Sequence, residues 1–231
     1  MRKVHSFLLI GQSNMAGRGE WNSIQPVSDP RIFMFRNNCW LPAVEPLHDD
    51  RPEAGVGLAM SFAAELLKSN PDIAVGLIPC AVGATTISEW LPGQALYRRA
   101  VEMARAALDE THTLQAVLWH QGEFDAGKIE DVRQYSPRLH EIIDALRKEF
   151  NNSRLPFISG ELGAFINAEI ALPFGEKISH TLKFLENEIP DYACVSAEDL
   201  KDKGDHLHFN SRSLREFGQR YSKAYLRLIS K

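Results

Sequence analysis

A serine stands at the centre of the most conspicuous polar motif in the chain. Residues 11–17 read Gly-Gln-Ser-Asn-Met-Ala-Gly and directly follow the apolar run Phe-Leu-Leu-Ile at positions 7–10. This pattern predicts a buried parallel strand that ends in a sharp, glycine-flanked turn with Ser13 at its tip. A nucleophile on such a strand-to-helix turn is exposed to substrate and has helix N-terminal amides beside it. From this segment alone, Ser13 is explained equally well as the cap of a helix.

A second candidate segment, Asp-His-Leu-His-Phe at positions 205–209, lies shortly before the last predicted helix. Asp205 and His208 are three residues apart, so one turn of the chain places the carboxylate against one ring nitrogen while the other nitrogen faces outward. This arrangement fixes the imidazole tautomer and prepares the ring to take a proton from a serine. Two alternative roles stay open for these histidines. His206 and His208 are also candidate metal ligands together with Asp205 or His120, or they simply cap the last helix or lie on its surface.

The third candidate segment is His120-Gln121-Gly122-Glu123, which follows a predicted strand at residues 115–119. The amide of Gln121 can donate to a developing oxyanion, a contact typically worth about 10²- to 10³-fold in rate. Glu123 is expected to order the turn rather than to act as a general base. His120 is expected to be a hydrogen-bonded structural histidine.

The elements that must position these residues alternate along the chain. Apolar runs at residues 31–35, 73–78, 115–119, 156–160 and 192–195 predict strands, and amphipathic stretches at 58–68, 95–108, 132–150, 174–188 and 211–229 predict helices. Such alternation implies βαβ crossovers, a parallel sheet covered on both faces and a three-layer α/β/α fold with about five strands. Residues 36–57, which hold four prolines or glycines after Pro42, are expected to form a long irregular excursion.

The ends of the predicted strands indicate where the candidate residues lie. The turns that follow Ile10, Ile78 and Trp119 all fall at the carboxyl edge of the predicted sheet, where open α/β sheets bind their ligands. We therefore expect the candidate residues to collect at this edge.

Bulk composition narrows the class of protein. The 231 residues are 44% hydrophobic and 24% charged with a formal net charge of -4, which favours one domain over residues 1–231 and argues against a nucleic acid partner. Only four strongly apolar residues precede Gly11, too few for a secretory signal or a membrane span, so a cytoplasmic protein without a membrane partner is expected. Cys39, Cys80 and Cys194 are odd in number and widely spaced, as is typical of reduced thiols rather than of disulfides or zinc ligands.

Taken together, these motifs resemble a known family. The 11–17 motif, Gly83 in an Ala-x-Gly-x-Thr turn, the 120–123 motif and Asp205-x-x-His208 are similar, in order, to those of the sialate O-acetylesterase and acetylxylan esterase-like branch of the SGNH hydrolases, the carbohydrate esterase family six group. The resemblance spans nearly the whole chain. It implies a flavodoxin-like sheet of five parallel strands in the order 2-1-3-4-5, a serine esterase acting on small acetylated carbohydrates, and no metal or organic cofactor.

The resemblance also implies catalytic roles. Ser13 corresponds to the nucleophile, His208 to the general base and then acid, and Asp205 to the carboxylate that orients the histidine. The implied oxyanion hole consists of the backbone amides of Ser13 and Gly83 and the side chain of Gln121. The substrate is left open among acetylated xylan oligomers, acetylated sialic acids and other acetyl sugars.

Supporting and substrate-binding positions follow from the same resemblance. They are Gln12, Asn14, Glu123 and Trp90, with Trp90 as a pocket wall able to stack on a sugar and with Trp40 and Arg18 as weaker candidates. Two departures from the family pattern concern the pocket. Ala84 stands where the family commonly has a second glycine, and Phe124-Asp125 stands where Ser-Asp or Thr-Asp is common.

Two other functions remain open. A carbohydrate-binding protein without turnover would share this fold, although the three residue types of a triad are all in place. A phosphate-binding enzyme is disfavoured because the first turn lacks both G-x-G-x-x-G and the P-loop lysine. Met15 occupies the final glycine of G-x-S-x-G, so the turn also differs from the α/β-hydrolase elbow.

Overall fold

A seven-stranded sheet forms the middle layer of the protein, as described by a computed structural model over residues 3–230. Residues 1, 2 and 231, the ends of the predicted domain, lie outside the described residues. The strands are β1 (Val4–Gly11), β2 (Ile32–Arg36), β3 (Cys39–Pro42), β4 (Ala74–Pro79), β5 (His112–His120), β6 (Phe157–Gly160) and β7 (Tyr192–Val195). Their order across the sheet is β3-β2-β4-β1-β5-β6-β7.

The predicted strand order is confirmed. Numbered along the chain, the five strands β4-β1-β5-β6-β7 follow the order 2-1-3-4-5, and every neighbouring pair among them is parallel. β2 extends this parallel sheet beyond β4. The apolar runs of these strands are buried, as expected for a parallel sheet covered on both faces.

The expectation that residues 36–57 are wholly irregular is wrong, because β3 forms within them and pairs antiparallel with β2. The turn between the two strands consists of Asn37 and Asn38, with φ of 52° and 57°. Two successive positive φ angles define the type I′ hairpin turn, and asparagine is one of the few residues that adopts them readily. β3 lies at the edge of the sheet and is largely exposed, so no run of buried apolar residues marks it in the sequence.

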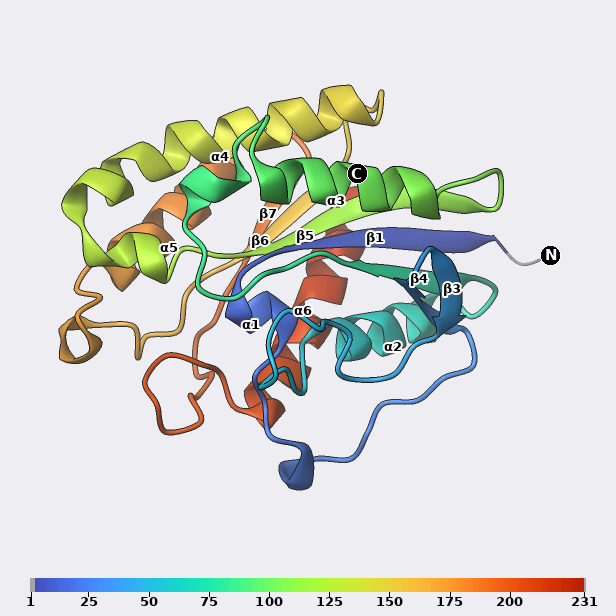
Figure 1. Cartoon of the computed structure of the whole chain (residues 1–231), viewed down its shortest axis with the longest axis horizontal. Helices are drawn as coiled ribbons and strands as arrows, with labels where there is room; N and C mark the ends of the chain where they lie inside the picture. The colour runs from blue at the N-terminus through green and yellow to red at the C-terminus, as the bar shows by residue number, and fades with distance from the viewer. Residues whose placement is uncertain (1–2, 231) are drawn as a thin grey trace.

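Helices cover both faces of the sheet and complete three layers (Figure 1). They are α1 (Ser13–Ala16), α2 (Ala59–Ser69), α3 (Ala95–Ala107), α4 (Ile129–Glu149), α5 (Gly175–Phe184) and α6 (Ser211–Ile229). α2 and α6 pack on one face, and α3, α4 and α5 pack on the other. Alternate residues of β1 serve the two cores, with Phe7 and Leu9 facing α2 and α6, and Leu8 and Ile10 facing the other layer.

α6 anchors the segment that carries Asp205 and His208. Its buried residues recur at helical spacing, and Gly218 lies so close to α2 that an added Cβ would sit 2.0 Å from the Leu58 carbonyl oxygen. Asn210 caps the helix, because its side chain accepts a hydrogen bond from the Ser213 N–H at 2.8 Å. The packing of α6 therefore fixes where the preceding loop arrives.

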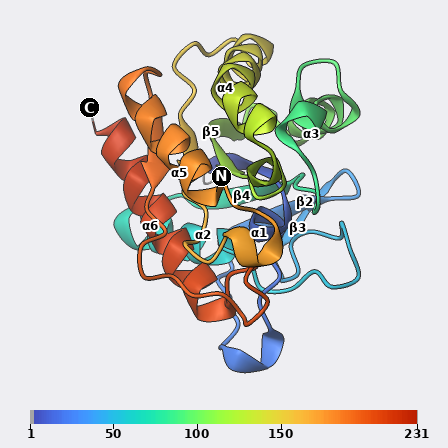
Figure 2. The ribbon, with the colours of Figure 1, turned by 90° about the vertical axis from the view of Figure 1, so that its left-hand side faces the viewer.

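The carboxyl ends of the parallel strands lie at one edge of the sheet, together with α1. Figure 2 views the molecule from that edge. β1 and β5 end side by side, with Gly11 opposite His120, and β4 ends at Pro79 opposite Leu9. Across residues 3–230 no helix has the length and apolar character needed to cross a membrane.

Candidate active site

Ser13 is held on a tight turn at the end of β1. Gly11 has a φ of 126°, and a Cβ added to it would lie 2.1 Å from the carbonyl oxygen of His120, so only glycine fits here. The Gln12 N–H donates to the same His120 oxygen at 2.8 Å. Ser13 is the first residue of α1, so its own N–H has no acceptor within the helix.

The structure brings Ser13, His208 and Asp205 together from opposite ends of the chain. The Nε2 atom of His208 lies 3.1 Å from the Ser13 Oγ atom, and its Nδ1 atom lies 2.7 Å from the Asp205 Oδ2 atom. The other Asp205 oxygen accepts from the backbone N–H groups of Leu207 and His208 at 3.0 and 2.8 Å. A carboxylate on Nδ1 favours the tautomer that carries its proton there and leaves Nε2 as the acceptor for the serine hydroxyl.

The surroundings shift the pKa values of both His208 and Asp205. Burial lowers the pKa of His208 below its ordinary value, and the hydrogen bond and charge of Asp205 oppose this change. Burial alone would raise the pKa of Asp205, but the hydrogen bonds from His208 and Leu207 hold it below its usual value. At neutral pH the pair is therefore a neutral imidazole oriented by a carboxylate.

Asn14 connects the serine turn to the histidine loop. Its Nδ2 atom donates to the Glu123 Oε1 atom at 2.6 Å and to the Leu207 carbonyl oxygen at 3.1 Å. Its Oδ1 atom accepts from the Phe209 N–H at 3.1 Å. Because Leu207 and Phe209 are the two neighbours of His208, a single buried amide fixes the backbone on both sides of that residue.

Beneath this amide lies a buried pair, Glu123 and His120. Both side chains are fully buried, with the His120 Nδ1 atom 3.9 Å from the Glu123 Oε1 atom. Burial raises the pKa of Glu123 to about 7 and lowers that of His120 to about 3, so His120 is neutral. The His120 ring packs edge to face against Phe209 and Phe217. The ring is packed in the core, but among the described residues neither of its nitrogens has a hydrogen-bond partner, so the expectation of a hydrogen-bonded histidine is wrong in that respect.

Gln121 lies in the same buried layer. Its amide nitrogen donates to Asp125 Oδ2 at 2.6 Å and to the Thr85 carbonyl oxygen at 2.9 Å, and it lies 3.3 Å from Gln12 Oε1. Burial raises the pKa of Asp125 to about 6. Both amide hydrogens of Gln121 therefore have acceptors within the protein.

The Gly83 turn is held by a buried ion pair that sequence reasoning missed. The Gly83 N–H donates to Asp50 Oδ2 at 2.7 Å, and the same oxygen accepts from Arg18 Nη2 at 2.6 Å. The side chains of Arg18 and Asp50 are only 3% and 2% exposed. A Cβ added to Gly83 would lie 3.5 Å from the Ser13 Cβ atom, which places this turn against the serine.

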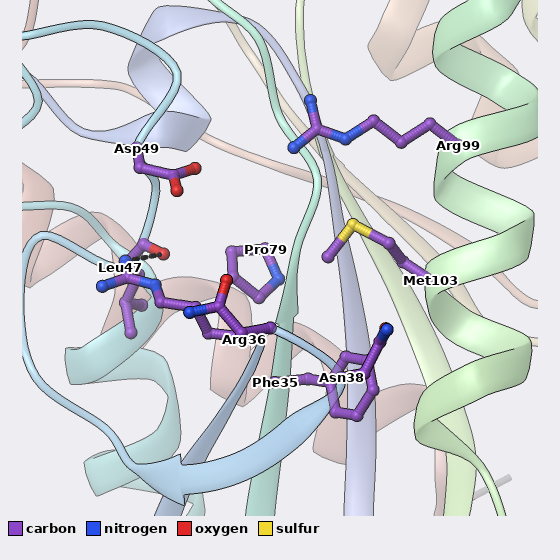
Figure 3. Close-up of a pocket in the computed structure, with 9 residues that line it drawn as sticks. Phe35, Arg36, Asn38, Leu47, Asp49, Pro79, Arg99 and Met103 are labelled. Carbon is purple, nitrogen blue, oxygen red and sulfur yellow. Dashed lines mark hydrogen bonds between the residues drawn. The ribbon is translucent and has the colours of Figure 1, made fainter.

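The loop that supplies Asp50 also lines a cavity of about 200 Å³ between the carboxyl ends of β2 and β4 and helix α3. Asp49 and Arg99 point into it from opposite sides, with Arg36, Asn38 and Met103 also on its lining (Figure 3). This loop is therefore a structured part of the carboxyl edge rather than a featureless connection.

The structure does not bring two of the aromatic candidates to the site. Trp90 is 1% exposed, donates from Nε1 to Thr85 Oγ1 at 3.1 Å and packs edge to face on Trp119. It braces the Thr85 turn from inside and has no face open to a sugar, contrary to the expected pocket wall. Trp40 stacks on His112, the first residue of β5, at the opposite edge of the sheet.

The alternative of a metal site requires a cluster of ligands. In the part of the chain that the structure describes, no group of three or more His, Cys, Asp or Glu side chains is arranged to hold an ion. His206 is exposed and lies near Asp202, while both ring nitrogens of His208 already face Asp205 and Ser13. The three cysteines are free thiols.

Comparison with known proteins gives a consistent set of relatives. The model of a family described as "Carbohydrate esterase, sialic acid-specific acetylesterase" matches residues 3–227. A protein of Arabidopsis thaliana named "Probable carbohydrate esterase At4g34215" is 34% identical over 243 residues, which cover 95% of this chain and 89% of the relative. Its crystal structure aligns with a TM-score of 0.88 and 30% identity over 97% of this chain and 98% of that one.

Two more distant solved structures share the fold. NanS aligns with a TM-score of 0.81 and 17% identity, over 100% of this chain and 99% of its own. A variant of Axe2, an acetyl xylan esterase from Geobacillus stearothermophilus, aligns with a TM-score of 0.57 and 12% identity, over 98% of this chain and 94% of its own.

Proposed function

The chain belongs to the carbohydrate esterase family of sialic acid-specific acetylesterases, and we propose that it removes O-acetyl groups from carbohydrates through an acetyl-serine intermediate on Ser13. As a member of this family it is a hydrolase that acts on ester bonds. The observation that carries the proposed mechanism is the chain of contacts from Ser13 Oγ to His208 Nε2 at 3.1 Å and from His208 Nδ1 to Asp205 at 2.7 Å.

The proposed first half-reaction forms the acetyl-enzyme. The Ser13 oxygen attacks the acetyl carbonyl carbon while His208 Nε2 takes the hydroxyl proton, and the carbonyl oxygen becomes an oxyanion. When the intermediate collapses, the bond to the sugar oxygen breaks and His208 returns its proton to that oxygen. Asp205 stays ionised and stabilises the imidazolium in between.

The second half-reaction reverses the roles. A water molecule gives a proton to His208 Nε2 and attacks the acetyl carbon, and the Ser13 oxygen leaves with the proton held by His208. Acetate and the free serine result. The modest exposure of the His208 side chain, 17%, is compatible with water reaching this ring from solvent.

Three donors are proposed for the oxyanion. The Ser13 N–H stands at the start of α1, and the Gly83–Ala84 turn adjoins Ser13. The third donor is the amide of Gln121, which is engaged with the Thr85 carbonyl oxygen before reaction. A charged oxygen accepts more strongly than a neutral carbonyl, so an oxyanion within reach draws this hydrogen away as charge develops.

The proposed substrates are small acetylated carbohydrates, with acetylated xylan oligomers, acetylated sialic acids and other acetyl sugars as the candidates. The family description names sialic acid, and the structural neighbour Axe2 is an acetyl xylan esterase. Polar side chains around the cavity in Figure 3 offer hydrogen-bonding groups near the same edge of the sheet.

The direct test is release of p-nitrophenol from p-nitrophenyl acetate by the wild type, Ser13→Ala and Gln121→Ala, each with and without a chelator. We expect loss of at least about 10⁴-fold for Ser13→Ala, about 10²- to 10³-fold for Gln121→Ala, and no effect of the chelator. Unchanged activity in Ser13→Ala would refute the serine mechanism, and loss with chelator would support a metal. A folded wild type without turnover on simple or sugar acetates would favour a carbohydrate-binding protein.

A further inference from the structure

The Gly83 N–H, the expected oxyanion donor, already has a charged acceptor. Asp50 Oδ2 lies 2.7 Å from the Gly83 nitrogen and 2.6 Å from Arg18 Nη2, and Asp50 Oδ1 lies 3.3 Å from Arg18 Nη1. A backbone N–H carries one hydrogen, so it cannot serve Asp50 and an oxyanion at full strength together. The substrate oxygen would have to replace the carboxylate.

Replacement is unfavourable because the carboxylate is locked in a buried ion pair. Arg18 and Asp50 are almost fully buried, and separating such a pair leaves a charge without compensation. Arg18 is itself fixed, since its Nη1 atom also donates to the Gly17 carbonyl oxygen at 2.8 Å. Gln121 differs from Gly83 in having two amide hydrogens, so it can donate to the Asp125 carboxylate and also to the neutral Thr85 carbonyl oxygen.

The next N–H along the turn belongs to Ala84. Ala84 is exposed between the buried residues Gly83 and Thr85, and its φ of 62° is unusual for a residue with a side chain. Within residues 3–230 its N–H donates to no protein acceptor. It follows directly on Gly83, which lies against Ser13, so the next backbone donor of this turn is one residue from that contact and, among the described residues, is not taken by a protein acceptor.

We propose that Asp50, held by Arg18, is a positioning residue that takes the Gly83 N–H and holds the turn so that the N–H of Ala84 is the oxyanion donor. The inference rests on the proposed serine mechanism and refines its oxyanion hole. Asp50 does not touch the reacting atoms. Its role is to keep the turn against Ser13 with one amide occupied and the next one open.

Replacing single backbone N–H groups by ester oxygens tests the donor atom by atom. Lactic acid in place of Ala84 and glycolic acid in place of Gly83 each remove one N–H and leave the side chain unchanged. We expect the change at position 84 to lower kcat on p-nitrophenyl acetate by about 10²- to 10³-fold with little change in KM. At position 83 the ester removes the N–H that Asp50 holds, so we expect a smaller loss, of about tenfold, from the weakened positioning of the turn. A larger loss in kcat at position 83 than at 84, or equal small losses at both, overturns the proposal.

Side-chain variants test the positioning role separately. In Asp50→Asn the carbonyl oxygen can reproduce both short contacts of Oδ2, to Gly83 and to Arg18, whereas Asp50→Ala loses both. Both variants leave Arg18 without its counter-charge, so their difference isolates the contacts. We expect kcat of Asp50→Ala to fall at least about tenfold below that of Asp50→Asn, with similar KM and with folding verified by circular dichroism. Equal kcat values would contradict the positioning role, and a kcat above wild type in Asp50→Ala would show that the carboxylate blocks the Gly83 donor.

Failure of this inference is distinguishable from failure of the serine mechanism. If Ser13→Ala keeps wild-type activity, the mechanism itself is wrong. If Ser13 is essential but the ester at position 83 causes the greater loss, only the assignment of Ala84 falls.

Discussion

The two sides of Ser13 are built in different ways. On the side of the base, the side chains of His208 and Asp205 are 17% and 36% exposed and sit on a loop. On the oxyanion side, the Asp50 side chain is 2% exposed and Gln121 is fully buried. The first side is assembled within four residues of sequence, and the second from segments far apart in the chain.

The contrast corresponds to two kinds of chemical work. A general base has to exchange protons with substrate and water, and a partly exposed histidine meets that need. Donors to an oxyanion act best when they are already aligned and shielded from water, because they then need no reorganisation during the reaction. Burial of polar groups favours partners within the protein, and Asp50, Gln121 and Asn14 accordingly make several short contacts.

The largest expected loss of activity comes from a change on the exposed side, where His208 and Asp205 lie. In Asp205→Asn an amide replaces the carboxylate, and its N–H₂ group favours the tautomer of His208 in which Nε2 carries the proton and cannot accept from Ser13. We expect kcat to fall about 10⁴-fold, measured with p-nitrophenyl acetate, while the melting temperature changes little. A loss of less than about tenfold would contradict the role of Asp205.

The next effect concerns Asn14, which joins the two sides. Asn14→Ala removes the contacts to Glu123, Leu207 and Phe209 and frees the loop around His208. Misplacement of a catalytic group by about 1 Å can lower the rate about 10²-fold, so we expect kcat to fall by about 10- to 100-fold. Asn70→Ala, at the end of α2, is the matched control and should leave kcat unchanged. Equal activities of the two variants would separate Asn14 from catalysis.

A third prediction concerns the effect of burying Glu123 on the unfolding free energy of the protein. The pKa of Glu123 rises from 4.5 to about 7 on folding, so between these values the folded protein binds more protons than the unfolded chain, and its stability falls as pH rises. Glu123→Gln lacks this titration. From pH 4.5 to above pH 7 the wild type should therefore lose about 3 kcal/mol of unfolding free energy relative to the variant.

Urea unfolding of the wild type and Glu123→Gln at several pH values gives this difference directly. Comparing the two proteins at each pH cancels the titration of His120, whose lowered pKa acts in the opposite direction. A difference that stays constant with pH would mean that burial does not shift the pKa of Glu123.

The smallest effect concerns Ala84. Its φ of 62° is unfavourable by roughly 1 kcal/mol for a residue with a Cβ, and glycine removes that strain. Ala84→Gly should raise the unfolding free energy by up to about 1 kcal/mol and keep kcat within about threefold, because the backbone N–H remains. Asn151→Gly, at a φ of 49° elsewhere on the chain, is the control for the backbone effect alone. A large loss of activity in Ala84→Gly alone would show that the methyl group itself shapes the site.

The sequence predicts best what is local. α6 spans Ser211–Ile229 as expected because its apolar spacing is visible in the chain. β3 is not predicted from the sequence, because an exposed edge strand has no buried apolar run. Its Asn-Asn turn also lacks the glycine that commonly marks such hairpins.

The same limit applies to the site. Asp205 and His208 are neighbours in sequence, and their contact follows from spacing. Asp50 and Gly83 are 33 residues apart in sequence, and the residues around Asp50 do not predict their contact. The family resemblance puts Trp90 at the pocket wall, but its indole N–H finds a buried partner in Thr85, and such pairing determines which face of a side chain remains open.

The most direct test of the serine mechanism is to find which atom becomes covalently modified. A p-nitrophenyl phosphonate ester reacts with an activated serine and stays attached, so peptide mapping by mass spectrometry locates the label. We predict loss of esterase activity in step with one phosphonyl group per chain on Ser13, with no labelling of Ser13→Ala and much slower labelling of Asp205→Asn. Inactivation with the label on another residue, or full esterase activity in the labelled protein, would contradict the mechanism.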